Sequence, residues 1–231
     1  MSLALVTAVR DGLATRADPD AAVSMQAYMK SAMPFRGVAK PAREGLLREV
    51  VAAHPVPDAP ALLAEVRALW DGATFREERY LALAVLGHRR YRAWAEPGWV
   101  ADLFQGWIVE GGWWDFTDEI ANRHVGPLVA AHGLAPLMRE WSVHPDRWLR
   151  RTSVICQLGA KDRTDLGLLT DAIEANLGDP DFFLRKGIGW ALRQYFRTDP
   201  EWVRTFVDTH PALSPLSRRE ALKHLRSASS A

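Results

Sequence analysis

Residues 111–120, GGWWDFTDEI, place two adjacent tryptophans, Trp113 and Trp114, directly before two carboxylates, Asp115 and Asp118. A carboxylate supplies a fixed negative charge and can orient or activate a water molecule. The face of a tryptophan ring attracts cations. A tryptophan wall beside an aspartate is therefore suited to stabilising positive charge that develops on a reacting molecule.

The two aspartates are expected to differ in role. Asp115 lies near a helix start, where an acidic residue is favoured as a cap and by the helix dipole, so we interpret it as structural. Asp118 remains as the candidate for chemistry, although spacing alone favours an ordinary helix contact with Arg123 or Asn122. Trp113 is interpreted as core packing, because adjacent helical side chains point about 100° apart and only one tryptophan can easily face a groove.

Helices are the elements that would carry these residues. Apolar residues at helical spacing predict helices over 41–54, 59–72 and 75–90. Short segments with proline or glycine separate the helices, and several place proline in the first helical turn. No segment has the alternation and turns of a β-hairpin. The sequence therefore predicts one all-α domain over 1–231 with about a dozen helices, whose rhythm is typical of HEAT-like repeats. We expect the last few residues to be disordered.

Two segments resemble each other, HPDRWLRRTSVICQL (144–158) and DPDFFLRKGIGWALRQY (179–195). Each begins with a Pro-Asp helix cap. Each then has two adjacent basic residues one turn later, namely Arg150, Arg151, Arg185 and Lys186. Stacked side by side, such helices would place positive charge along one surface, which suits a long polyanion.

The C-terminal third has a local excess of basic residues interleaved with aromatic ones. The basic residues are Arg185, Lys186, Arg193, Arg197, Arg204, Arg218, Arg219, Lys223 and Arg226, and the aromatic residues are Trp190, Tyr195 and Trp202. Nucleic-acid surfaces combine charge for phosphate with aromatic rings for sugar or base. For any single arginine a solvated outer face is the favoured interpretation, whereas for the whole set we expect nucleic-acid binding.

Composition excludes several other classes of protein. The 231 residues carry a formal net charge of +1. The overall charge therefore gives no indication of a polyanionic partner. Cys156, the single cysteine, excludes an internal disulfide, and its apolar surroundings predict a buried thiol in a reducing compartment. The seven histidines form no HxxxH pattern, and glycine-rich nucleotide-binding motifs are absent, so we expect no metal and no cofactor. No apolar stretch is long enough for a membrane helix and no secretory signal is visible, so we expect a cytoplasmic protein with no membrane partner.

Five segments resemble, in order, the signatures of the AlkD family of DNA alkylation-repair glycosylases: MQAYMKSAMPFRGVAKPAREGLL, GGWWDFTDEI, DRWLRRTSVICQL, DFFLRKGIGWALRQY and LSPLSRREALKHL. They run from near residue 25 to about residue 225. The resemblance implies a curved HEAT-like solenoid that wraps duplex DNA on a basic concave surface. It also implies hydrolysis of the N-glycosidic bond of cationic N3- or N7-alkylated purines, without flipping of the base.

Residue by residue, the resemblance assigns Asp118 to the last aspartate of the family's Trp-Trp-Asp-x-x-Asp motif and Trp114 to its second tryptophan. Arg151 matches the arginine of Trp-Leu-x-Arg, Trp190 the tryptophan of Gly-Trp, and Tyr28 the N-terminal tyrosine. The motif makes Asp118 the preferred catalytic candidate, and retention of all five argues against a non-catalytic subgroup. Arg151, if it lies near Asp118, would hold the carboxylate ionised. For Tyr28, a core position is an equal alternative.

The expected function is that of a monofunctional alkylpurine DNA glycosylase, acting as a monomer on double-stranded DNA that contains alkylated purines. The candidate catalytic residues are Asp118, Trp114, Trp190 and Arg151. The candidate DNA-binding residues are Tyr28, Arg150, Arg185, Lys186, Arg193, Arg218, Arg219 and Lys223. The alternative is a non-catalytic helical-repeat protein that binds distorted DNA or a protein partner.

Overall fold

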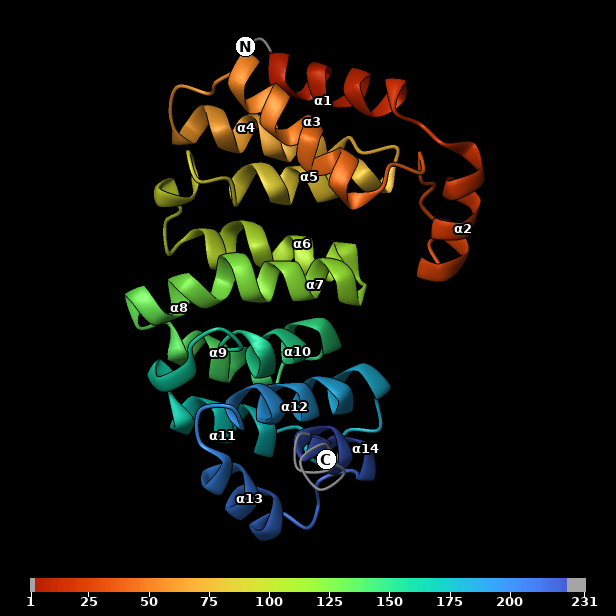
Figure 1. Ribbon diagram of the computed structural model, residues 1–231. Coiled ribbons are helices and arrows are strands. Elements are labelled where there is room, and N and C mark those ends of the chain that lie inside the picture. The colour runs from red at the N-terminus through yellow and green to blue at the C-terminus, as the bar shows by residue number, and fades with distance from the viewer. Residues whose placement is uncertain (1–2, 224–231) are drawn as a thin grey trace. The chain divides into compact units, whose positions relative to one another are not determined.

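The computed structural model describes residues 3–223, and helices are the only regular elements among them (Figure 1). The prediction of an all-α helical-repeat fold of about a dozen helices is confirmed. The chain divides into two compact units, unit 1 over Met1–Ala95 and unit 2 over Glu96–Ala231. A single domain over the whole chain stays a prediction, and the expected disorder of the last residues, together with Arg226, lies outside the described residues.

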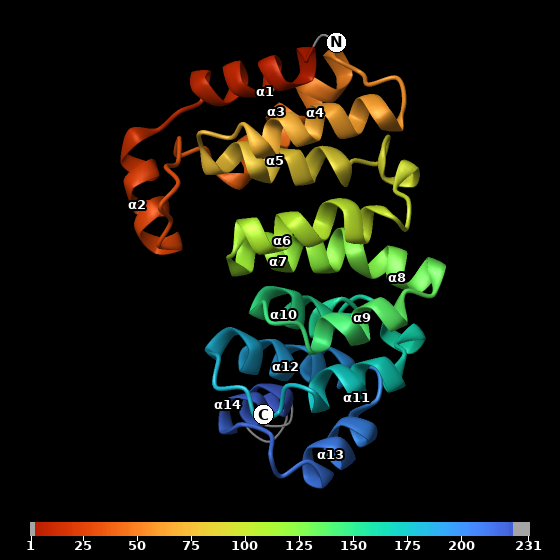
Figure 2. The same ribbon diagram turned by 180° about the vertical axis from the view of Figure 1, so that it is seen from behind.

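Within residues 3–95, unit 1 contains five α-helices and one short 3-10 turn. The elements are α1 (Ala4–Thr15), α2 (Pro19–Met29), α3 (Lys40–Ala53), α4 (Ala59–Asp71), α5 (Arg76–Leu86) and the turn Arg92–Trp94. The apolar faces of α1, α3, α4 and α5 pack on one another around Val9, Leu62 and Leu69, which are fully buried. Figures 1 and 2 show α2 to one side of this group. Only Met29 of α2 is buried, so this helix adds little to the core.

A buried carboxylate fixes the segment that joins α2 to α3. Glu77 of α5 is completely buried and accepts hydrogen bonds from the backbone N–H groups of Arg36, Gly37 and Val38 at 2.9–3.1 Å. Gly37 has φ +81°, and a Cβ there would lie 2.0 Å from the carbonyl oxygen of Asp18. Only glycine tolerates this backbone angle and this close approach.

The described part of unit 2, residues 96–223, contains nine α-helices and shorter segments. The helices are α6 (Gln105–Gly111), α7 (Trp114–Ile120), α8 (Gly126–His132), α9 (Ala135–Ser142), α10 (Arg147–Ile155), α11 (Leu166–Glu174), α12 (Phe182–Tyr195), α13 (Pro200–Thr209) and α14 (Pro215–Ala221), and Lys161–Arg163 is a 3-10 turn. The helix α10 packs against both α7 and α12, and α12 packs against α14. Figure 1 shows α7, α10 and α12 in successive layers of this unit.

The repeated Pro-Asp segments cap the two helices on which the site depends. Asp146 accepts hydrogen bonds from the backbone N–H groups of Trp148 and Leu149 at the start of α10, at 2.8 and 3.1 Å. Asp181 accepts one from Leu184 at the start of α12, at 3.0 Å. Such caps satisfy donors that the first helical turn leaves free.

One predicted helix boundary is wrong. The helix expected over 75–90 ends at Leu86, and Gly87 is its C-cap. His88, Arg89 and Arg90 therefore lie on a turn, so they no longer follow the direction of α5. Glycine at the end of an apolar stripe is a normal stop signal for a helix. The helix therefore stops at this glycine and does not continue through the basic residues that follow.

Two five-residue π-helical segments in unit 2 were not predicted. They are Val100–Phe104, which leads into α6, and Ala121–Val125, which joins α7 to α8. The ring of His124 stacks on Phe104 with centroids 5.2 Å apart. His124 is buried, and its Nε2 has no hydrogen-bond partner among the described residues.

We expect His124 to make the protein acid-sensitive. Burial, and then the charge of Arg123, lower the pKa of His124 to about 4. Protonation in the unfolded chain begins near pH 6.5, so stability is full above that pH and is lost as pH falls towards 4, by about 3 kcal/mol. Thermal unfolding of wild type and His124→Phe between pH 7 and pH 4 measures this loss.

The phenylalanine variant keeps the aromatic stack and removes the titration, so its stability should fall less steeply than that of wild type. Replacement of the exposed His132 with phenylalanine controls for the loss of one histidine. Equal pH slopes for wild type and His124→Phe would contradict the prediction.

Among residues 3–223, no helix is both long and apolar enough to cross a membrane.

Candidate active site

The candidate site begins at the turn between α6 and α7. Gly112 ends α6 in the left-handed region, with φ +49°, and Trp113 is the extended N-cap residue of α7. Asp115 lies in the first turn of α7, as expected for a residue that interacts with the helix dipole. Asp118 lies about one turn further along.

Arg151 of α10 binds the Asp118 carboxylate through two parallel hydrogen bonds. Its Nε lies 2.7 Å from Oδ1 and its Nη2 lies 2.9 Å from Oδ2. The third guanidinium nitrogen, Nη1, donates to the carbonyl oxygen of Phe183 in α12. The Arg151 side chain is 6% exposed and that of Asp118 is 17% exposed. This bidentate geometry fixes the carboxylate in one orientation.

Arg123 and Asn122, the neighbours that sequence spacing suggests, do not bind the Asp118 carboxylate. Arg123 forms an ion pair with Glu119 at 3.5 Å. Asn122 donates to the backbone oxygen of Asp118, at 2.7 Å. The side chain of Asp118 is thus directed to a residue of another helix.

Burial raises the pKa of Asp118 above its ordinary value, and the negative charge of Asp115 adds to this rise. The hydrogen bonds and the positive charge of Arg151 lower the pKa and so oppose the effect of burial without cancelling it. The carboxylate is therefore poorly solvated but paired with a cation, and such a site strengthens electrostatic interactions with a bound molecule.

Gly187 of α12 makes room for Arg151. A Cβ at this position would lie 2.9 Å from Nη1 of Arg151, closer than real Cβ contacts. Gly189 serves the packing of α14 in the same way, because a Cβ there would lie 2.8 Å from the backbone oxygen of Ser217. Arg151 and α14 therefore approach the backbone of α12 closely at these two glycines.

The tryptophans occupy different environments. Trp190 of α12 is half-buried, and the Cζ atom of Arg151 lies 6.0 Å from its ring centroid. Trp114 is the half-buried first residue of α7. Trp113 packs on Trp148 and Phe183, with centroids 6.1 and 5.4 Å away. Packing of Trp113 against neighbouring rings therefore agrees with its interpretation as a structural residue.

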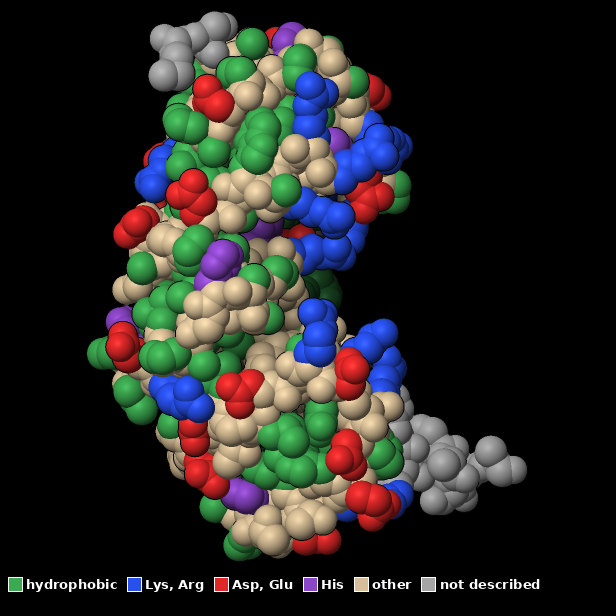
Figure 3. Space-filling view, turned by 90° about the vertical axis from the view of Figure 1, so that its left-hand side faces the viewer, with side chains coloured by type: hydrophobic (Ala, Val, Ile, Leu, Met, Phe, Trp, Pro, Cys, Tyr) green, Lys and Arg blue, Asp and Glu red, His purple; other side chains and the backbone are tan. Residues whose placement is uncertain are grey.

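The basic residues expected to bind DNA are mostly engaged by groups of unit 2. Arg150 binds Asp179 at 2.9 Å and two backbone oxygens, and Arg185 donates to the backbone oxygen of Asp179. Lys186 and Arg193 both approach Glu220, and Arg218 donates to the backbone of His210. Lys186, Arg219 and Lys223 are exposed. Figure 3 shows acidic side chains among the Lys and Arg residues on the visible face of this unit. The role of this set in DNA binding stays a prediction.

Tyr28 is 77% exposed on α2 of unit 1, which rules out the alternative of a core position. Its role in DNA binding stays a prediction.

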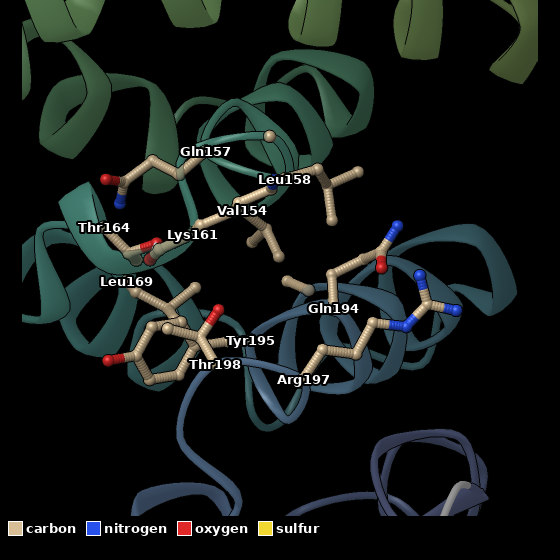
Figure 4. Close-up of a pocket in the computed structure, with 12 residues that line it drawn as sticks. Val154, Gln157, Leu158, Lys161, Thr164, Leu169, Gln194, Tyr195, Arg197 and Thr198 are labelled. Atoms are coloured by element: carbon tan, nitrogen blue, oxygen red, sulfur yellow. The ribbon is translucent and has the colours of Figure 1, made fainter.

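A separate cavity of about 400 Å³ lies between α10, α11 and α12, and none of the four candidate catalytic residues lines it (Figure 4). Val154 and Leu169 belong to its apolar lining, and Gln194 and Arg197 to its polar lining. No group of three or more His, Cys, Asp or Glu side chains suited to a metal ion occurs within residues 3–223. Cys156 is buried, and burial raises the pKa of its thiol to about 12.

The sequence profile described as "DNA alkylation repair enzyme" matches residues 9–225. The chain belongs to this family. The solved structure described as "Predicted DNA alkylation repair enzyme from Enterococcus faecalis" is similar to it, with 31% identity and a TM-score of 0.81. The similarity covers 91% of this chain and 97% of that one. No curated protein matches the chain. As a member of the DNA alkylation repair enzyme family, the protein is an enzyme of alkylated-DNA repair.

Proposed function

We propose that this protein is a monofunctional DNA glycosylase that hydrolyses the N-glycosidic bond of cationic N3- or N7-alkylated purines in duplex DNA. The observation that carries the proposal is the Asp118 carboxylate, which is 17% exposed and is held at both oxygens by Arg151. The guanidinium of Arg151 in turn lies 6.0 Å from the ring centroid of Trp190. Family membership supports a repair reaction on alkylated DNA.

The chemistry of the lesion explains why a carboxylate suffices. Alkylation at N3 or N7 places a positive charge on the purine, which makes it a good leaving group without a general acid. As the bond breaks, positive charge develops on C1′ and O4′ of the deoxyribose, and a nearby fixed negative charge lowers this barrier. Asp118 supplies that charge.

Asp118 also orients the attacking water. A carboxylate oxygen accepts up to two hydrogen bonds, so each oxygen of Asp118 keeps acceptor capacity beyond the bond to Arg151. Arg151 is a positioning residue, because it touches Asp118 and fixes its direction. Trp114 and Trp190 line the deoxyribose, where their faces stabilise the developing cation.

The product is an intact strand with an abasic site. A lyase step needs an amine nucleophile, and the proposed site contains only a carboxylate, a guanidinium and two indole rings. The proposed mechanism leaves the lesion in the duplex without flipping, as the resemblance to the AlkD family implies. The protein is proposed to act as a monomer on double-stranded DNA and without a cofactor.

The alternative is a non-catalytic helical-repeat protein that binds distorted DNA. The ion pair alone does not distinguish the two functions, because a bidentate pair between α7 and α10 also joins two helices without any reaction. Base release decides between the two functions.

The test follows base release from a duplex that carries a single N7-methylguanine, with protein in excess and duplex binding measured in parallel. We expect release faster than the spontaneous rate, and a strand that breaks only after alkaline treatment. A duplex of the same sequence without the lesion is the control. Binding of the damaged duplex with release at the spontaneous rate would support the non-catalytic alternative.

A further inference from the structure

Unit 1 contains a basic pocket that the sequence pattern does not predict. The cavity measures about 570 Å³ and is lined by Arg48, Val51 and Ala52 of α3 and by His88, Arg89 and Arg90 of the turn after α5. It exists because α5 ends at Leu86, which allows the turn to bring the two arginines beside α3. Figure 3 shows Lys and Arg side chains gathered along the right-hand edge of unit 1.

The three arginines of the pocket are exposed and form no ion pair with an acidic side chain of residues 3–223. The acidic residues of α3 have other partners, since Glu44 lies 3.9 Å from Lys40 and Glu49 lies 2.6 Å from Arg16. The positive charge of the pocket is therefore not neutralised. This arrangement contrasts with unit 2, where Asp179 and Glu220 engage several of the basic residues.

His88 adds a hydrogen-bond donor to the pocket. Its Nδ1 accepts a hydrogen bond from the backbone N–H of Arg90 at 3.3 Å, so the neutral ring carries its proton on Nε2. Burial, and then the positive charges of Arg89 and Arg90, lower the pKa of His88. Val51 and Ala52 supply small apolar walls.

We propose that this pocket binds a phosphate group. Arginine side chains present several N–H donors in a fork that matches phosphate oxygens, and three arginines line this pocket together with a histidine. In the enzyme acting on DNA, the ligand is a backbone phosphodiester, and that assignment rests on the proposed function. A free phosphate compound offers the same chemistry.

The test compares Arg89→Gln/Arg90→Gln with Lys40→Gln/Arg123→Gln. Both double variants lose two positive charges, and the control positions are exposed residues paired with glutamates four positions away. Two measurements are made on each full-length protein: binding of an undamaged duplex over a range of salt concentrations, and calorimetric titration with inorganic pyrophosphate. Because the duplex has no lesion, the result does not depend on base release.

For a phosphodiester site, the pocket variant loses duplex affinity by about tenfold at low salt, and the salt-dependence slope decreases by about one relative to the control. Loss of pyrophosphate binding alone, with unchanged duplex binding, assigns the pocket to a free phosphate compound. Duplex and pyrophosphate binding equal to those of the control variant overturns the proposal. Failure of wild type to release base bears on the proposed function and leaves this comparison intact.

Discussion

Asparagine in place of Asp118 is expected to slow base release by about a hundredfold to a thousandfold, which is the usual effect of removing one preorganised electrostatic contact from an active site. Asparagine is nearly isosteric with aspartate, but it carries no charge to balance the cationic sugar. Single-turnover release of N7-methylguanine from a duplex measures the effect, with duplex binding measured in the same buffer.

The matched control is Asp115→Asn, one turn earlier on α7, which removes the same charge and should retain most of the activity. Asp118→Asn leaves Arg151 without an ionised partner. Thermal unfolding must therefore show that this variant is folded at the assay temperature. Release at the wild-type rate by a folded Asp118→Asn protein would contradict the assigned role.

Replacement of Arg151 with glutamine is expected to destabilise the protein by about 3–5 kcal/mol, because it leaves the Asp118 carboxylate buried without its ion pair. Urea unfolding at neutral pH measures this free energy. Arg151→Lys keeps the charge and loses the two parallel hydrogen bonds, so it should recover only part of the stability.

Arg151→Gln should also move the acidic limb of the pH–rate profile to higher pH. Burial raises the pKa of Asp118 and Arg151 opposes that rise, so removal of Arg151 raises the pKa further. Activity needs the ionised carboxylate, and it is lost as pH falls through this pKa, hence at a higher pH in the variant. Base release between pH 4.5 and pH 8, corrected for spontaneous loss, gives the profile. An unchanged acidic limb would mean that Asp118 does not limit the rate.

Much of the fold was predictable, because the signals for helices are local. The helices expected over 41–54 and 59–72 agree within one residue with α3 and α4. Apolar stripes and proline in the first turn define such elements without information from the rest of the chain. The caps at Asp146 and Asp181 also follow from short segments of sequence.

The site was less predictable, because its contacts join distant residues. Asp118 and Arg151 are 33 positions apart, and spacing alone favoured a contact between Asp118 and Arg123 or Asn122. The family motif selected Asp118, whereas only the structure shows the two hydrogen bonds from Arg151. Engagement of Arg150 by Asp179 was missed for the same reason.

Other features left no periodic signal. A π-helical segment changes the hydrogen-bond register over a few residues without altering the composition, so Val100–Phe104 and Ala121–Val125 read as ordinary helix. The basic pocket of unit 1 was missed because Arg89 and Arg90 were assigned to a helix that ends before them.

Arg151 links three successive layers of unit 2, since it extends from α10 to Asp118 of α7 and to the Phe183 carbonyl of α12. In a repeat protein each layer contacts only its neighbours, so layers can open one at a time. A buried side chain shared by three of them makes their opening concerted. The residue that aligns the carboxylate therefore also sets the cooperativity with which this part of the chain unfolds.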